Sequence, residues 1–184
     1  EPSGEGCNSY ERYVEDFDYC RKLNNNAVRI SLAWNRIEPD EGKFNQEVVD
    51  HYIKVLKSAQ ERGLKTFVTL HHFTNPSWFA KKGGFINFKS PRYFARYAKF
   101  CAEKFGGLID VYLTINEPQV YALMSYVNGI WPPNHRNYFE ALIVQINLMR
   151  CHAVAYKAIK SVANFPIGIV KHIAWYEADK YQGT

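Results

Sequence analysis

The chain is poor in cysteine, and the four cysteines that it has are scattered. Cys7, Cys20, Cys101 and Cys151 lie far apart, and no Cys-x-x-Cys pair occurs. Structural zinc sites and disulfide-rich scaffolds depend on closely spaced cysteines, so the spacing argues against both. Cys101 and Cys151 fall within apolar helical patterns, which predicts that they are buried free thiols. We therefore expect no metal and no disulfide framework.

The sequence also contains no dense cluster of charges of one sign. The net charge is +5, and the basic residues form only short pairs such as Arg21-Lys22 and Lys81-Lys82. Because a nucleic-acid-binding face carries a denser basic stripe, we interpret these charges as solvated surface. No nucleic-acid partner is expected.

Long apolar runs and nucleotide-binding motifs are absent as well. No apolar run approaches the ~20 residues that a membrane-spanning helix requires, so no membrane partner is expected. The first residues show no signal-peptide pattern, and a cytoplasmic location is the expectation. No Gly-x-Gly-x-x-Gly sequence follows a predicted strand, and no phosphate-binding loop occurs.

Aromatic residues, in contrast, are abundant. They make up 16% of the chain, with 13 Tyr and 12 Phe among its 184 residues. Aromatic side chains pack cores, and they also line clefts that bind sugars and other rings. The length is sufficient for one domain with a real core, and we treat residues 1–184 as a single domain.

Helical and strand patterns alternate along the chain. Strands are predicted at 27–34, 66–72, 111–117 and 167–172, and helices at about 10–20, 45–62, 90–105 and 138–162. The long connection at 73–89 is typical of a functional loop. Such alternation implies a parallel sheet with right-handed crossovers. The sheet is either an open doubly wound sheet or part of a closed barrel, and the open form lacks its usual nucleotide-binding motif.

Polar side chains stand at matching places at the ends of successive predicted strands. Arg29 lies on the polar face of the first strand, His71 and His72 end the second, and Asn116 and Glu117 end the third. Strand side chains alternate, so His71 and His72 face opposite ways and at most one enters a pocket. Each residue also has a plainer interpretation. The arginine could pair with a core carboxylate, the histidines could be structural, and the asparagine could make a turn.

Together these residues suit the cleavage of a glycosidic bond. That reaction requires an acid to protonate the leaving oxygen and a second carboxylate on the other face of the sugar ring. Amides and imidazoles bind sugar hydroxyls, and aromatic rings cover apolar sugar faces. Glu117, Asn116, His72 and the nearby aromatic residues supply most of this set.

An ordered series of motifs resembles glycoside hydrolase family 1, the β-glucosidase family. The segments that carry the resemblance are 8–18, 83–85 and 94–98, together with Val-Arg-Ile-Ser-Leu-Ala-Trp-Asn-Arg-Ile-Glu-Pro at 28–39, Thr-Leu-His-His-Phe at 69–73 and Leu-Thr-Ile-Asn-Glu-Pro at 113–118. They span almost the whole chain in order. The resemblance implies an α/β fold, namely a partial TIM (β/α)8 barrel of about four parallel strands with intervening helices.

The resemblance also implies a role for each residue. Glu117 would be the general acid and base, Asn116 would bind the hydroxyl next to the anomeric carbon, and His72 would bind a further hydroxyl. Arg29 would support the nucleophile electrostatically. Phe73 stands where the family usually has Trp and would present a ring face to the substrate without the indole N–H.

The nucleophile that the family requires is a Glu in a Thr-Glu-Asn-Gly type motif, and no such motif occurs here. A (β/α)8 barrel takes about 250 residues, so we expect a fragment that is inactive alone and pairs with the missing barrel half or another chain. The predicted function is that of a retaining β-glycosidase acting on β-linked glycosides without a cofactor. The alternatives are a related barrel glycosidase such as a cellulase, or a non-catalytic half-barrel that binds sugar or serves in assembly.

Overall fold

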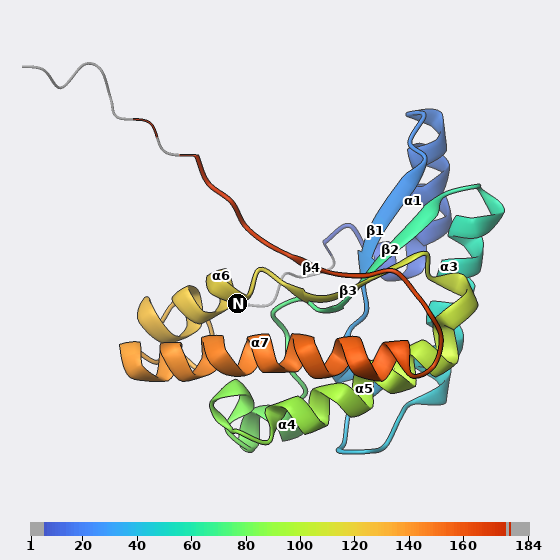
Figure 1. Ribbon diagram of the computed structural model, residues 1–184. Helices are drawn as coiled ribbons and strands as arrows, with labels where there is room; N and C mark the ends of the chain where they lie inside the picture. The colour runs from blue at the N-terminus through green and yellow to red at the C-terminus, as the bar shows by residue number, and fades with distance from the viewer. Residues whose placement is uncertain (1–5, 176, 178–184) are drawn as a thin grey trace, which may run out of the picture.

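The computed structural model describes residues 6–175 and 177, and its centre is a sheet of four parallel strands. The strands are β1 (Ala27–Ser31), β2 (Lys65–His71), β3 (Val111–Asn116) and β4 (Ile167–Val170), in the order β1-β2-β3-β4 (Figure 1). In register, Thr66 pairs with Val28 of β1, and Ile115 pairs with His71 of β2. The central strands β2 and β3 are mostly buried, whereas β1 and β4 are largely half-buried.

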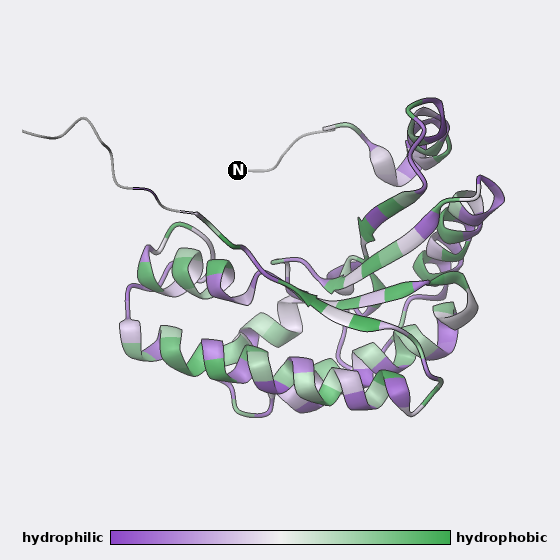
Figure 2. Cartoon of the chain, turned by 45° about the horizontal axis from the view of Figure 1, so that its top comes forward, coloured by the Kyte–Doolittle hydropathy of each residue, from purple (hydrophilic) through white to green (hydrophobic). Residues whose placement is uncertain are grey.

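Helices connect the strands, as parallel pairing requires. The longer ones are α1 (Ser9–Lys22), α3 (Gln46–Glu61), α5 (Ser90–Phe105) and α7 (Tyr138–Lys160). The side chains of Asn45 and Asn137 accept backbone N–H bonds at the starts of α3 and α7, and thereby cap both helices. Both views of the chain place α5 and α7 side by side on one side of the sheet (Figures 1 and 2).

Short helices follow the carboxyl ends of the strands. They are α2 (Trp34–Ile37), α4 (Ser77–Lys81), the 3-10 turn η1 (Gly84–Ile86), α6 (Pro118–Ala122) and the π-helical η3 (Leu123–Val127). A further 3-10 turn, η2 (Gly106–Leu108), lies between α5 and the start of β3. The connection predicted as a loop at 73–89 therefore contains α4 and η1. It is anchored in the core because Phe79 and Phe85 are buried.

The first strand is shorter than predicted. It ends at Ser31, and Trp34 begins α2 instead of extending the strand. The indole of Trp34 stacks on Tyr97 at a centroid distance of 5.0 Å, and its Nε1 donates to a Glu38 carboxylate oxygen at 2.7 Å. These two contacts draw the chain out of the sheet, and the alternating pattern of 27–34 gives no sign of either.

Helix α7 has apolar residues on both sides. Val144 and Leu148 are buried, whereas Leu142, Ile146 and Met149 are exposed, and hydrophobic bands recur along the helix in Figure 2. A helix that is apolar all round is normally packed on more than one side. Together with the half-buried edge strands, this face matches the open sides expected of an incomplete barrel.

Two further predictions, on the cysteines and on membrane-spanning helices, can be compared with the structure. Cys101 and Cys151 are buried free thiols, as predicted. None of the described helices is long and apolar enough to cross a membrane.

Candidate active site

The ends of β1 and β3 are joined by the side chains of Arg29 and Asn116. Arg29 Nη2 donates to Asn116 Oδ1 at 2.5 Å, and Arg29 Nε donates to Thr69 Oγ1 of β2 at 3.1 Å. Asn116 is buried, and its Oδ1 is already used, so its Nδ2 remains as the donor for another group. The plainer interpretation of Arg29 is wrong, because no carboxylate pairs with it in the described part of the chain.

His72 lies on the same side of the sheet. Its Nδ1 is 2.8 Å from Ser31 Oγ of β1, which leaves Nε2 for a ligand. Partial burial lowers the pKa of His72, and the charge of Arg29 lowers it further, whereas the charge of Glu117 acts in the opposite direction. The imidazole is therefore in the field of both Arg29 and Glu117, and it is neutral at neutral pH.

Glu117 follows β3 and immediately precedes α6. Its backbone is in the left-handed region, with φ 41° and ψ 63°, and its N–H donates to Val170 O of β4 at 2.9 Å. The side chain is half-buried, and its carboxylate has no hydrogen-bond or ion-pair partner within residues 6–175 and 177. A carboxyl group with free oxygens beside a buried amide is available to a ligand.

Phe73 follows β2 in a comparable way. It too has a positive φ, 73°, and its ring lies 5.0 Å from the His72 ring and 4.7 Å from the Trp131 ring. Backbone outliers at non-glycine residues cost free energy and cluster at functional sites. Phe73 and Trp131 form an aromatic wall next to the polar group made by Arg29, His72 and Asn116.

Sequence reasoning missed a partly buried chain of hydrogen bonds that begins at His71, next to His72. His71 Nε2 is 3.0 Å from Asn75 Oδ1, and Asn75 Nδ2 donates to the Tyr121 hydroxyl at 2.9 Å. Tyr121 belongs to α6, and its N–H donates to Glu117 O at 3.1 Å. The chain thus ties the end of β2 to α6, the helix that directly follows Glu117. Strand alternation correctly turned His71 away from His72, but nothing in the sequence linked Asn75 to Tyr121.

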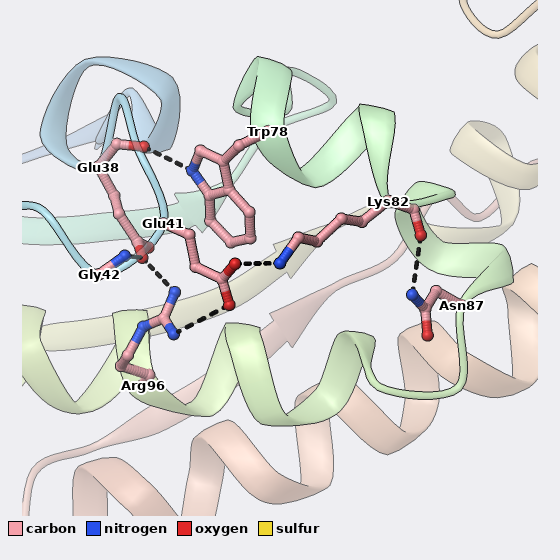
Figure 3. A network of polar contacts seen from close by, with 7 residues as sticks. All are labelled: Glu38, Glu41, Gly42, Trp78, Lys82, Asn87 and Arg96. Carbon is pink, nitrogen blue, oxygen red and sulfur yellow. Dashed lines mark hydrogen bonds and ion pairs between the residues drawn. The ribbon is translucent and has the colours of Figure 1, made fainter.

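A second network holds the segments that follow β1 and β2. Glu38 is fully buried, and its carboxylate accepts from Trp34 Nε1, from Gly42 N at 2.8 Å and from the Arg96 guanidinium. Figure 3 shows Arg96 between Glu38 and Glu41, with Lys82 of the α4 end on the other side of Glu41 and Trp78 Nε1 donating to Glu38 O. The network anchors the α2 segment to α4 and α5. Among the described residues no cluster of three His, Cys, Asp or Glu side chains suits a metal.

Comparison with known proteins completes this picture. The sequence model of Glycosyl hydrolase family 1 matches residues 3–181. Beta-glucosidase A of Thermotoga maritima is 34% identical over 173 residues, which cover 93% of this chain and 39% of that enzyme. A 6-phospho-beta-galactosidase of Clostridium acetobutylicum is 34% identical over 164 residues, covering 88% of this chain and 35% of that enzyme.

Solved structures agree with the sequence relatives. The family 1 β-glucosidase of Thermotoga maritima superimposes with a TM-score of 0.90 at 33% identity, covering 96% of this chain and 40% of that one. A β-glycosidase of Pyrococcus horikoshii superimposes with a TM-score of 0.84 at 39% identity, covering 90% of this chain and 38% of that one. The Thermotoga maritima enzyme has also been solved in complex with deoxynojirimycin. The chain thus spans about 40% of the length of these (β/α)8-barrel glycosidases, which confirms the predicted partial barrel over the open sheet.

Proposed function

The chain belongs to glycosyl hydrolase family 1, and we propose that it supplies the proton-donor part of the active site of a retaining β-glycosidase. The observation that carries the proposal is the placement of Asn116, which Arg29 fixes and which the carboxyl group of Glu117 follows directly, with no partner for that group among the described residues. The substrates are β-linked glycosides, which is the substrate class that the names of the relatives indicate.

In the first step Glu117 donates its proton to the leaving oxygen as the glycosidic bond breaks. A second carboxylate, which the site described above does not contain, attacks the anomeric carbon and forms the glycosyl-enzyme intermediate. In the second step Glu117 takes a proton from water, and the water oxygen displaces the carboxylate. Glu117 therefore ends the cycle protonated, as it began.

Two groups bind the sugar in this proposal. Asn116 donates from Nδ2 to the hydroxyl beside the anomeric carbon, because Arg29 occupies its Oδ1. His72 is neutral and is held at Nδ1 by Ser31, so its Nε2 faces a further hydroxyl. Both side chains are held by partners on β1, which fixes their orientation before a sugar binds.

Arg29 has a further role in the proposal. Its side chain makes two hydrogen bonds to neutral groups, on Thr69 and Asn116, and no carboxylate in the described part of the chain neutralises its charge. An unneutralised guanidinium at this place attracts the carboxylate of the nucleophile and stabilises its ionised form. The charge therefore supports the nucleophile that the second half of the barrel would bring.

A chimera tests the proposal directly. In it, this chain replaces the matching 39% of Thermotoga maritima β-glucosidase A, so that the other enzyme supplies the remaining strands. We expect the chimera to hydrolyse aryl β-glucosides. Glu117→Gln should lower kcat/KM by about 10²- to 10⁴-fold for a glucoside with a poor leaving group, the usual contribution of general acid catalysis.

The same variant should lose much less with a 2,4-dinitrophenyl leaving group, which departs with little protonation. Glu103→Gln is the matched control, because Glu103 is an exposed residue of α5. Equal losses for both leaving groups would contradict the assignment of Glu117 as the acid.

A further inference from the structure

The segments that follow β2 and β3 leave the sheet at equivalent places. His71 of β2 pairs with Ile115 of β3. Two positions further on, the backbone enters the left-handed region, at Phe73 on one strand and at Glu117 on the other. Beyond this pair, no backbone hydrogen bond joins the two segments among the described residues. Another contact must therefore set the position of one segment relative to the other.

Asn75 closes a turn around Phe73. Its Oδ1 is 3.0 Å from Nε2 of His71, four residues earlier. Burial lowers the pKa of His71 to about 4, so the imidazole is neutral near pH 7. Its Nδ1 is buried without a partner in the described part of the chain, which places the single ring proton on Nε2, where it donates to Asn75. The amide oxygen of Asn75 is thereby used, and its Nδ2 is directed elsewhere.

That Nδ2 group reaches the segment after β3. It donates to the Tyr121 hydroxyl of α6 at 2.9 Å, and among the described residues this is the only hydrogen bond between residues 72–76 and 117–122. Tyr121 is buried, and its backbone N–H donates to Glu117 O at 3.1 Å. A single side-chain bond from Asn75 thus leads to the residue that holds the backbone of Glu117.

Proton donation depends on how these two segments are held together. A general acid acts within hydrogen-bond reach of the oxygen that it protonates, about 2.6–3.2 Å. A misplacement of about 1 Å can lower the rate about 100-fold. In the proposed function His72 and Phe73, after β2, contact the sugar, whereas the acid follows β3. The bond between the segments therefore affects the distance from the acid to the leaving oxygen.

We propose that Asn75 and Tyr121 are positioning residues, whose hydrogen bond sets the place of Glu117 relative to His72 and Phe73 and so supports proton donation to the leaving oxygen. The inference rests on the proposed function, because only there is Glu117 the acid. Neither Asn75 nor Tyr121 contacts the reacting atoms in this proposal. Their loss should therefore slow the substrates that need a proton, and not all substrates alike.

The chimera described above tests this with two leaving groups. Tyr121→Phe and Asn75→Leu should each lower kcat/KM about 10-fold for a glucoside with a poor leaving group, and by much less for the 2,4-dinitrophenyl glucoside. The double variant should lose about as much as Asn75→Leu alone, because both substitutions remove the same bond. Tyr97→Phe is the matched control. The hydroxyl of this buried tyrosine donates to Leu70 O at 3.3 Å, so its loss should leave the ratio between the two substrates unchanged.

Hydrogen exchange in the 184-residue chain tests the link to Glu117 without any turnover. The amides of Val120 and Tyr121 both donate to Glu117 O. Relative to the amides of α3, they should exchange about 2- to 10-fold faster in Tyr121→Phe, the usual effect of one neutral hydrogen bond, and equally fast in Tyr97→Phe.

The outcomes separate the two proposals. An unchanged substrate ratio or an unchanged relative exchange rate in Tyr121→Phe would overturn the positioning role. If the loss in Glu117→Gln depends on the leaving group but the loss in Tyr121→Phe does not, this inference alone fails. If Glu117→Gln loses equally with both leaving groups, the proposed function fails, and the positioning role fails with it.

Discussion

Replacing Arg96 by Met should destabilise the chain far more than an ordinary surface substitution. Arg96 is the only charged partner of the fully buried Glu38 carboxylate among the described residues, and its own side chain is 34% exposed. Arg96→Met therefore leaves a buried charge without its countercharge. Breaking a buried pair in this way costs about 3–5 kcal/mol. Glu38 retains the donors Trp34 Nε1 and Gly42 N, so we expect about 3 kcal/mol.

The cost should fall when Glu38 is neutral. In a Glu38→Gln background no buried carboxylate loses its countercharge. Arg96→Met then removes only the contacts of the guanidinium with Glu41 and with the rings of Trp78 and Tyr93, whose centroids lie at 5.6 and 5.8 Å. Partly exposed contacts of this type contribute about 1 kcal/mol or less. The two substitutions should therefore be non-additive by about 2 kcal/mol.

Urea unfolding followed by tryptophan fluorescence measures these free energies, with the slope m checked for constancy. Lys99→Met is the matched control, because Lys99 lies on the same helix in a half-exposed ion pair with Glu103 and should cost less than about 1 kcal/mol. If Arg96→Met costs the same with Glu38 as with Gln at position 38, the pair is not coupled and the reasoning is wrong.

Three further predictions concern pH, activity and stereochemistry. Burial lowers the pKa of His71 from 6.5 to about 4, so between these pH values the unfolded chain binds a proton that the folded chain does not. The free energy of unfolding should therefore fall by about 3 kcal/mol as the pH drops from 6.5 to 4. The fall should be smaller in the His71→Gln variant. The 184-residue chain alone should show no turnover of 4-nitrophenyl β-glucoside, since it lacks the nucleophile motif, and robust turnover would disprove this. In the chimera, azide should restore turnover to Glu117→Gly and give the β-glycosyl azide, whereas an α-azide in the product would identify Glu117 as the nucleophile.

The strand-end residues could be found from the sequence because they depend on local patterns. Alternation within 66–72 separated His71 from His72, and the Pro after Glu117 located the end of β3. Parallel order then requires that these ends lie at one edge of the sheet. The pairing of Arg29 with Asn116, 87 residues apart, could not be read in the same way. It depends on both strands flanking β2, and therefore on the strand order.

The networks behind the site were beyond sequence reasoning for a related reason. Glu38 looks like an ordinary surface carboxylate in a Pro- and Glu-rich segment, yet it is fully buried. Its burial depends on Trp34, which leaves the predicted strand to stack on Tyr97. It also depends on Arg96 of α5, which lies 58 residues after Glu38 in the sequence. Local pattern gives no information on such contacts, since each partner alone has a common interpretation.

The backbone at Phe73 and Glu117 links these networks to the site. Both residues follow a buried strand, both have positive φ, and neither is a glycine. A conformation of this kind costs about 1–3 kcal/mol for a non-glycine residue, so the surroundings must hold it in place. At Glu117 the conformation is stabilised by the hydrogen bond from its N–H to Val170 O. It is also stabilised by the hydrogen-bonded chain from His71 through Asn75 to Tyr121, which lies on α6. These hydrogen bonds contact no substrate in the proposed mechanism, yet they tie the backbone of Glu117 to β4 and to α6 and so support the position of its carboxyl group.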